Sequence, residues 1–237
     1  MITGTGQLRI GDLPLHISFT VPAGPCAPGA LLPGVQALAD RITDYCMTKA
    51  GQAGRPVSCQ KGCGACCRQM VPVSPVEARN LHSLVEAMSP ENQTAVRVRF
   101  KAAQQVLPAT GLGNPGHPVE DKPAYRAYGL GYFRVGMPCP FLQDESCSIH
   151  PDRPLVCREY VVTSPASACA APGTGLVKQI AVPISTWAAF GRSTSETGAL
   201  EWMPLIHSLD YVNENPAPPI TRTGPQHVEA FLKEMRQ

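Results

Sequence analysis

The sequence predicts one mainly helical, loop-rich α+β domain with a peripheral N-terminal β-hairpin. Apolar residues alternate with polar ones near the N-terminus and then recur at helical spacing along most of the chain. Glycine and proline supply 21 and 25 of the 237 residues, which implies many ordered turns and loops. A chain of this length with 43% hydrophobic residues can bury a sizeable core.

The first fifty residues predict the hairpin and a helix. Apolar side chains alternate over residues 15–21, as in a half-buried strand. A Gly-Asp turn at 11–12 separates this run from a weaker apolar run at 8–10, which favours a hairpin. The apolar spacing then changes to a helical one from Val35, and this helix is expected to end near Gly51.

The middle of the chain predicts three helices. Ser74 and Glu77, with a proline between them, form a capping box that opens the first of these helices. Ser89 caps the second in the same way. Residues 108–124 contain four prolines and are expected to form a loop, and the aromatic-rich residues 125–136 are expected to be helical.

The C-terminal part predicts one strand and two helices. The strand is expected at 177–184, and a helix around 200–209 is expected to follow a Ser-x-x-Glu box at 193–196. A proline-rich linker over 213–224 leads to a last helix that a Thr-x-x-Gln box at 223–226 opens. We expect three parts in the single domain, namely a hairpin and helix at 1–56, a cysteine-cluster metal-binding module at 57–170, and a C-terminal strand and helices at 171–237.

Charge and hydropathy exclude several classes of protein. Lys and Arg number 20 against 18 Asp and Glu, so the net charge is only +2 and no nucleic-acid partner is expected. No apolar run approaches the ~18 residues of a membrane span, and residues 1–10 do not resemble a signal peptide. A cytoplasmic location without membrane contact is therefore expected, and a protein partner stays open. The short basic run of Arg97, Arg99 and Lys101 is expected to be a solvated helix face.

Seven of the ten cysteines fall into two tight groups. The first cysteine group has the spacing C-x3-C-x2-C-C and consists of Cys59, Cys63, Cys66 and Cys67. The second cysteine group has the spacing C-x7-C-x9-C and consists of Cys139, Cys147 and Cys157. A reducing compartment disfavours disulfides, and core thiols have no reason to cluster, so this pattern predicts metal ligands. Of the other three, Cys46 lies on the apolar face of its helix and is expected to be a core thiol.

The neighbours of these cysteines suit a thiolate site. Gly62 and Gly64 favour a tight loop over a continuous helix in the first group. Three arginines next to the groups are candidates for offsetting the negative charge of thiolates, namely Arg68, Arg153 and Arg158. Cys169 and His150 are further ligand candidates outside the main pattern. We expect the sulfurs of both groups to meet in one cluster, despite their separation in the chain.

Two segments also resemble a known family. The stretches VSCQKGCGACCRQMVPVSPVEA and CPFLQDESCSIHPDRPLVCREY resemble the YkgJ-type cysteine-cluster family, which is described as carrying a zinc- or iron-chelating domain. Its cysteine pattern is similar to that of flagellin lysine N-methylases. The resemblance spans about residues 57–170 and implies that the metal ligands are Cys59, Cys63, Cys66, Cys67, Cys139, Cys147 and Cys157. The first gap has three residues here, where the simplest form of the family has two.

An iron–sulfur cluster, four-iron rather than two-iron, is the expected cofactor, with zinc as the alternative. Zinc sites commonly pair two short knuckles, and only one is present here, whereas iron–sulfur clusters accept irregular spacing. Seven thiolates also exceed the needs of one tetrahedral zinc ion.

The sequence therefore predicts a metal-binding protein in which an iron–sulfur cluster would allow a redox role. The alternatives are a protein-modifying enzyme of the lysine N-methylase type and an interaction module whose metal is purely structural. No catalytic residue can be picked out. The G-x-G-x-x-G match at 111–116 lacks the preceding strand of a nucleotide-binding fold, and Cys63-x-x-Cys66 lacks the surroundings of a thioredoxin motif.

Overall fold

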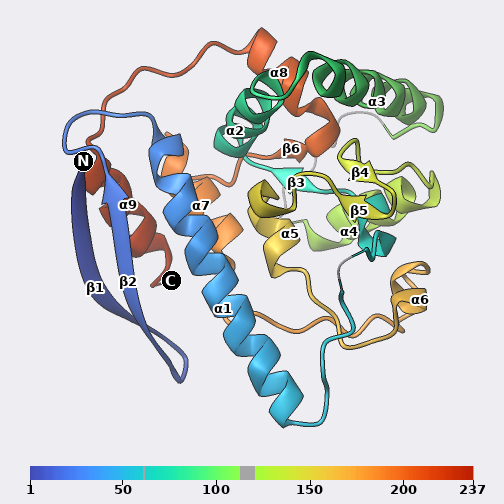
Figure 1. Ribbon diagram of the computed structural model, residues 1–237, viewed down its shortest axis with the longest axis horizontal. Helices are drawn as coiled ribbons and strands as arrows, with labels where there is room; N and C mark the ends of the chain where they lie inside the picture. The colour runs from blue at the N-terminus through green and yellow to red at the C-terminus, as the bar shows by residue number, and fades with distance from the viewer. Residues whose placement is uncertain (61, 113–120, 237) are drawn as a thin grey trace.

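The computed structural model describes residues 1–60, 62–112 and 121–236 as a single mainly helical α+β domain (Figure 1). The α-helices are α1 (Leu32–Gln52), α2 (Pro75–Glu86), α3 (Pro90–Ala109), α4 (Lys122–Arg134), α5 (Leu155–Glu159), α6 (Ala166–Cys169), α7 (Thr186–Thr194), α8 (Ser208–Glu214) and α9 (Gly224–Glu234). The short 3-10 helices are η1 (Pro28–Leu31), η2 (Ala65–Arg68), η3 (His150–Asp152) and η4 (Leu205–His207). No helix among the described residues combines the length and the apolar character that crossing a membrane requires.

Three two-stranded antiparallel sheets accompany these helices. The N-terminal hairpin pairs β1 (Ile2–Ile10) with β2 (Leu13–Val21), as predicted. A short pair joins β3 (Pro72–Val73) to β6 (Met203–Pro204), and another joins β4 (Leu142–Gln143) to β5 (Ser146–Cys147). The last pair, a hairpin within the second cysteine group, was not predicted.

The long helix α1 divides the molecule. Hairpin β1–β2 and α9 lie on one side of α1, and the segments that carry the second cysteine group lie on the other (Figure 1). Alternate residues of β2 are buried against α1 and α9, so the predicted half-buried strand is confirmed. The largest core cluster includes Phe19, Val35, Leu155, Phe190 and Phe231, and therefore ties the hairpin to α5, α7 and α9.

A second core cluster lies under the cysteines. It joins α2, α3 and α8 through buried residues that include Leu81, Phe100 and Leu209. Phe100 packs edge-on against Phe141, with the ring centroids 5.4 Å apart, next to the half-buried Cys139 and Cys147. Two cysteines of the second group, Cys139 and Cys147, thus pack against this apolar cluster.

The predicted caps form where expected. The side chain of Ser74 accepts a hydrogen bond from the Glu77 backbone, and the Glu77 carboxylate accepts one from the Ser74 backbone, which completes the capping box of α2. Thr223 and Gln226 do the same for α9. Ser89 caps α3, which runs to Ala109. Residues 113–120, which hold most of the G-x-G-x-x-G match at 111–116 and the middle of the predicted loop at 108–124, lie outside the described residues. The two ends of that loop prediction are wrong, because α3 runs to Ala109 and α4 begins at Lys122.

Two predictions for the C-terminal part are wrong. Residues 177–184 form no strand, because their only ladder contact is an isolated bridge between Val162 and Gln179. The box at 193–196 does not open a helix, since Ser193 lies inside α7, which Ser185 caps. The chain is extended in β6, where a helix around 200–209 was expected, because that segment pairs with β3, and α8 begins only at Ser208.

Candidate metal centre

The first cysteine group lies on a tight loop and one 3-10 turn. The backbone N–H of Cys63 donates to the carbonyl oxygen of Gln60 at 3.1 Å, and that of Cys67 donates to Gly64 at 3.0 Å. Gly62 has a φ of +84°, a left-handed conformation that favours glycine. The predicted tight loop is therefore confirmed, and Cys66 and Cys67 sit in η2.

The second cysteine group is spread over a hairpin and a helix. Cys139 precedes β4, Cys147 lies in β5, and Cys157 lies in α5. Asp144 and Glu145, with φ of 48° and 55°, form the two-residue turn of the β4–β5 hairpin. Both are left-handed without being glycine, a conformation that costs free energy and is retained where the surroundings fix it.

The segments that carry the two cysteine groups are in contact, whereas the meeting of their sulfurs in one cluster stays a prediction. The backbone N–H of Cys139 donates a hydrogen bond of 2.7 Å to the carbonyl oxygen of Cys67. Arg68 forms a two-point ion pair with Glu145 at 2.6 and 3.0 Å, which ties η2 to the turn of the β4–β5 hairpin. A Cβ at Gly64 would lie 2.6 Å from the Glu145 carboxylate, 2.8 Å from the Leu142 side chain and 3.1 Å from the Glu145 carbonyl oxygen, so the two segments approach closely at this glycine.

Two buried glutamates hold α5, the helix that presents Cys157. Glu77 of α2 accepts a hydrogen bond of 2.9 Å from the backbone N–H of Leu155, the first residue of α5. Glu159, the last residue of α5, accepts hydrogen bonds from Thr186 at 2.5 Å and from the backbone N–H of Trp187 at 3.1 Å, at the start of α7. A carboxylate at a helix N-terminus satisfies free N–H groups there. Cys157 therefore sits on a helix that is fixed at both ends.

The thiols of the second group are neighbours of one another and of Cys66. Burial, together with the smaller effects of nearby Cys147 and Cys66, raises the pKa of Cys139 to about 12. Burial likewise raises the pKa of Cys157 well above its usual range, and Cys139, Cys66 and Cys147 add to the rise. Such thiols stay protonated at neutral pH unless a cation stabilises the thiolate, which argues against a reactive dithiol and suits a metal ligand.

A second set of thiols lies around Cys59. Burial raises the pKa values of Cys59 and Cys169, and each interacts electrostatically with Cys63 and Cys66. Cys169 is buried at the end of α6, which packs against η2. Ser58, next to Cys59, donates its backbone N–H to Val162 at 3.0 Å. The structure thus brings Cys169, a minor candidate from its spacing, to the first cysteine group.

The thiols of these cysteines are donors that suit a soft metal, but the orientations of their side chains do not define a single metal site. The gathered side chains are thiols, the preferred ligands of zinc and of iron–sulfur clusters. Within residues 1–60, 62–112 and 121–236, however, no three His, Cys, Asp or Glu side chains are arranged so that they could hold one metal ion. The backbone brings the predicted ligands together, and their side chains do not converge on a single point.

The three arginines that the sequence suggested as charge partners of the thiolates form ion pairs with carboxylates near the cysteines. Arg158 is buried and pairs with Asp40 at 2.5 Å, and Arg153 pairs with the same carboxylate at 3.3 Å. Arg153 also lies 3.2 Å from Nδ1 of His150. Together with the Arg68–Glu145 pair, these contacts hold the loops that carry the cysteines.

Arg99 was misjudged from the sequence. Its Nε is buried and has no hydrogen-bond partner among the described residues. Arg99 is also close enough to Cys139 to lower the pKa of that thiol against the effect of burial. The expected solvated face is therefore wrong for Arg99, whereas Arg97 forms an ion pair with Glu86. Both arginines are half-buried and no local pattern distinguishes them, since the packing of α3 decides that Nε of Arg99 is enclosed.

Two cysteines lie apart from these contacts. Cys46 is half-buried on α1 and packs against the largest core cluster, in agreement with its prediction as a core thiol. Cys26 is buried near the start of α9, where its backbone N–H donates to Arg222 at 3.0 Å.

Comparison with known proteins places this site in a family. Residues 58–174 match the family model CxxCxxCC, described as a "putative zinc- or iron-chelating domain". The matched segment contains all seven predicted ligands and Cys169. No curated protein and no solved structure matches the chain. Residues 58–174 therefore form a cysteine-cluster domain of the CxxCxxCC family.

Proposed function

We propose that the thiols gathered around Cys66 hold a metal centre, and that binding this metal is what the domain does. The observation that carries the proposal is the position of Cys157. Its thiol is buried on a helix fixed at both ends and has Cys139, Cys147 and Cys66 as neighbours. Thiols from separate segments near one another are the donors that soft metals prefer, and metal binding would deprotonate them and draw them together.

An iron–sulfur cluster is our preferred occupant. Seven or eight thiols exceed the four that a tetrahedral zinc ion uses, and the spacing of the second cysteine group is irregular. Arg99 places a positive charge near Cys139, which suits a centre with several anionic sulfurs. In this proposal the thiolates that bind the cluster come from Cys59, Cys63, Cys66, Cys67, Cys139, Cys147 and Cys157. An iron–sulfur cluster would give the domain a role in electron transfer.

The experiment is anaerobic purification followed by absorption spectroscopy and by analysis of iron, zinc and acid-labile sulfide. Brown protein with stoichiometric iron and sulfide supports the iron–sulfur proposal. Colourless protein with stoichiometric zinc and no sulfide supports a thiolate zinc centre and rejects the electron-transfer role. Protein that retains no metal under these conditions, and binds neither metal on reconstitution, contradicts the proposed function as a whole.

A further inference from the structure

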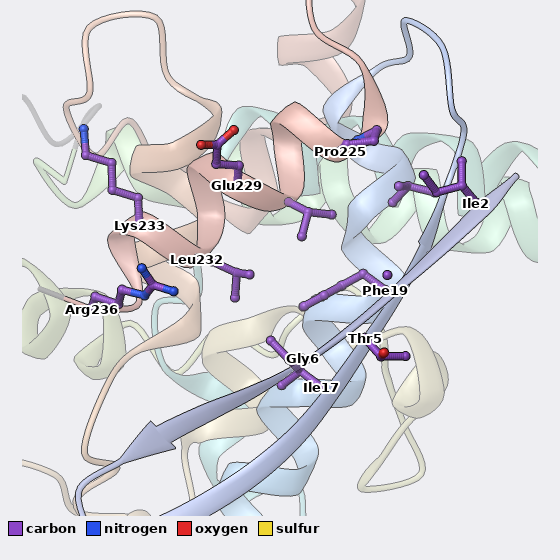
Figure 2. Close-up of a pocket in the computed structure, with 13 residues that line it drawn as sticks. Ile2, Thr5, Gly6, Ile17, Phe19, Pro225, Glu229, Leu232, Lys233 and Arg236 are labelled. Atoms are coloured by element: carbon purple, nitrogen blue, oxygen red, sulfur yellow. The ribbon is translucent and has the colours of Figure 1, made fainter.

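A groove on the far side of α1 from the cysteines separates the N-terminal hairpin from α9. Its cavity volume is about 720 Å³, and its lining is mainly apolar. Figure 2 shows Ile17 and Phe19 of β2 facing Leu232 of α9 across this space, with Arg236 at one end and Ile2 and Pro225 at the other.

The groove exists because β1 has no side chains at two core-facing positions. Gly4 lies opposite Phe19 and Gly6 lies opposite Ile17 in the hairpin, so both belong to the face that Leu8 and Ile10 bury farther along. An apolar side chain at either position would occupy the groove. Glycine is unfavourable inside a strand, because it loses much conformational freedom and packs nothing.

The fold itself does not require these two glycines. Neither has a left-handed backbone, and a Cβ at Gly4 would meet no atom within 4 Å. A Cβ at Gly6 would meet only Ile17, at an ordinary contact distance of 3.8 Å. By contrast, a Cβ at Gly34 would lie 2.6 Å from the Phe19 ring, so that glycine is needed for α1 to pack on the same hairpin.

The outer edge of β1 is also unoccupied. Among the described residues β1 pairs with β2 alone, and it lies at the outside of the molecule (Figure 1). Residues 2–8 contain no charge and no proline, the features by which exposed edge strands usually avoid pairing. The backbone N–H and C=O groups on this edge are therefore available to an added strand.

One end of the groove is cationic. Lys233 and Arg236 line it at the C-terminal end of α9, and no ion pair of either is found in the described part of the chain. Glu229 is the only acidic residue of the lining and lies one turn earlier on the helix. A segment lying along β1 would thus meet positive charge near Gly6 and Leu232.

We propose that this groove binds an extended segment of a partner protein, which adds to the free edge of β1, places alternate apolar side chains over Gly4 and Gly6, and carries an acidic residue beside Arg236. The strand edge favours a polypeptide over a small apolar ligand, and the cationic end fixes the sign of the partner's charge. This proposal is independent of the metal centre, because α1 stands between the two.

The test uses a displayed library of random nine-residue segments, selected on the full-length protein. Enriched segments are expected to alternate apolar and polar residues and to carry Asp or Glu toward one end. Gly4→Val/Gly6→Val, which fills the groove, should weaken their binding by at least about tenfold, as should Lys233→Glu/Arg236→Glu, which reverses the charge. Thr3→Val, on the opposite face of the same strand, is the control and should bind as the wild type does.

Thermal melting of the filled variant separates loss of binding from loss of folding. Valine suits a strand better than glycine, so Gly4→Val/Gly6→Val should melt no lower than the wild type. The proposal would be overturned if no segment is enriched, or if the enriched segments lack alternating apolar residues or an acidic residue. It would also be overturned if folded Gly4→Val/Gly6→Val binds the segments as tightly as the wild type does. A concentration-dependent dimer that the filled variant loses would overturn it too, because the occupant would then be a second copy of this chain.

Discussion

The backbone N–H of Cys139 lies 2.7 Å from the carbonyl oxygen of Cys67, and this hydrogen bond joins the two cysteine groups directly. The contact is reinforced by the Arg68–Glu145 ion pair, which closes η2 onto the β4–β5 hairpin. The two segments differ in apolar support, since the described residues from Cys59 to Arg68 contribute no side chain to the core clusters. A metal bound between them would order both, so metal binding and folding should be coupled.

Replacing Cys157 should remove metal and stability together. Cys157→Ser takes away a buried thiol whose neighbours are Cys139, Cys147 and Cys66, and the folding free energy that metal binding supplies should fall with it. Cys46→Ala is the control, because it loses only packing on α1. Metal analysis and thermal melting of both variants test this. Equal metal loss in the two would contradict the assignment of the centre.

Cys169 should contribute to the metal centre, although its spacing alone makes it only a minor ligand candidate. Cys169→Ser is expected to weaken metal retention by about tenfold in a chelator competition, since the thiol lies with Cys59, Cys63 and Cys66. Cys26→Ser provides the comparison, because Cys26 is also buried and lies near α9 instead. If both variants retain metal as the wild type does, Cys169 is a structural thiol of α6.

Arg99 should increase the metal affinity of the centre without being a metal ligand. Arg99→Met removes the positive charge near Cys139, and metal affinity should drop by about 10- to 100-fold, as for other groups that support metal ligands. Arg97→Met, two residues earlier on α3, loses only its exposed pair with Glu86. Competition with a chromophoric chelator measures both affinities. An unchanged affinity in Arg99→Met would show that its charge does not reach the metal.

Glu77 should be important for stability because it links α2 to α5. Glu77→Ala leaves the backbone N–H groups of Ser74 and Leu155 without their acceptor and should lower the free energy of unfolding by about 1–3 kcal/mol. Glu91→Ala, in the exposed first turn of α3, should cost much less. Urea denaturation gives both values, and similar costs for the two variants would contradict this role.

Glu159 should give stability a defined pH dependence. Burial raises the pKa of this carboxyl above its usual 4.5, against the hydrogen bonds from Thr186, Ser185 and Trp187. The folded state therefore holds the proton more tightly, and this contribution to stability falls as pH rises from about 4.5 through the folded-state pKa. Glu159→Gln does not titrate, so its stability relative to the wild type should increase with pH across that window. A difference that stays constant across that window would argue against this role of Glu159.

Local signals explain what the sequence could predict. The capping boxes at Ser74 and Thr223, and the alternation in β2, involve residues that contact each other within a few positions. The cysteine spacing was informative for the same reason, since short loops limit where the thiols can go. These features are visible without knowledge of the tertiary structure.

Other features depend on partners that are distant in the chain. The segment 177–184, expected to be a strand, finds no strand to pair with in the described part of the chain, and is a loop with one bridge at Gln179. The β4–β5 hairpin turns at Asp144 and Glu145, which lack the glycine that usually marks such a turn. The packing of α3 encloses Nε of Arg99, and the packing of α6 brings Cys169 near Cys59.

A crystal structure of the metal-loaded protein, with anomalous scattering recorded at the iron and zinc edges, tests the central claim most directly. We predict a metal peak beside Cys66, with metal–sulfur bonds of about 2.3 Å to thiols of both the first and the second cysteine group. A metal bound by thiols of one group alone, or a peak away from all seven predicted ligands, would contradict the account.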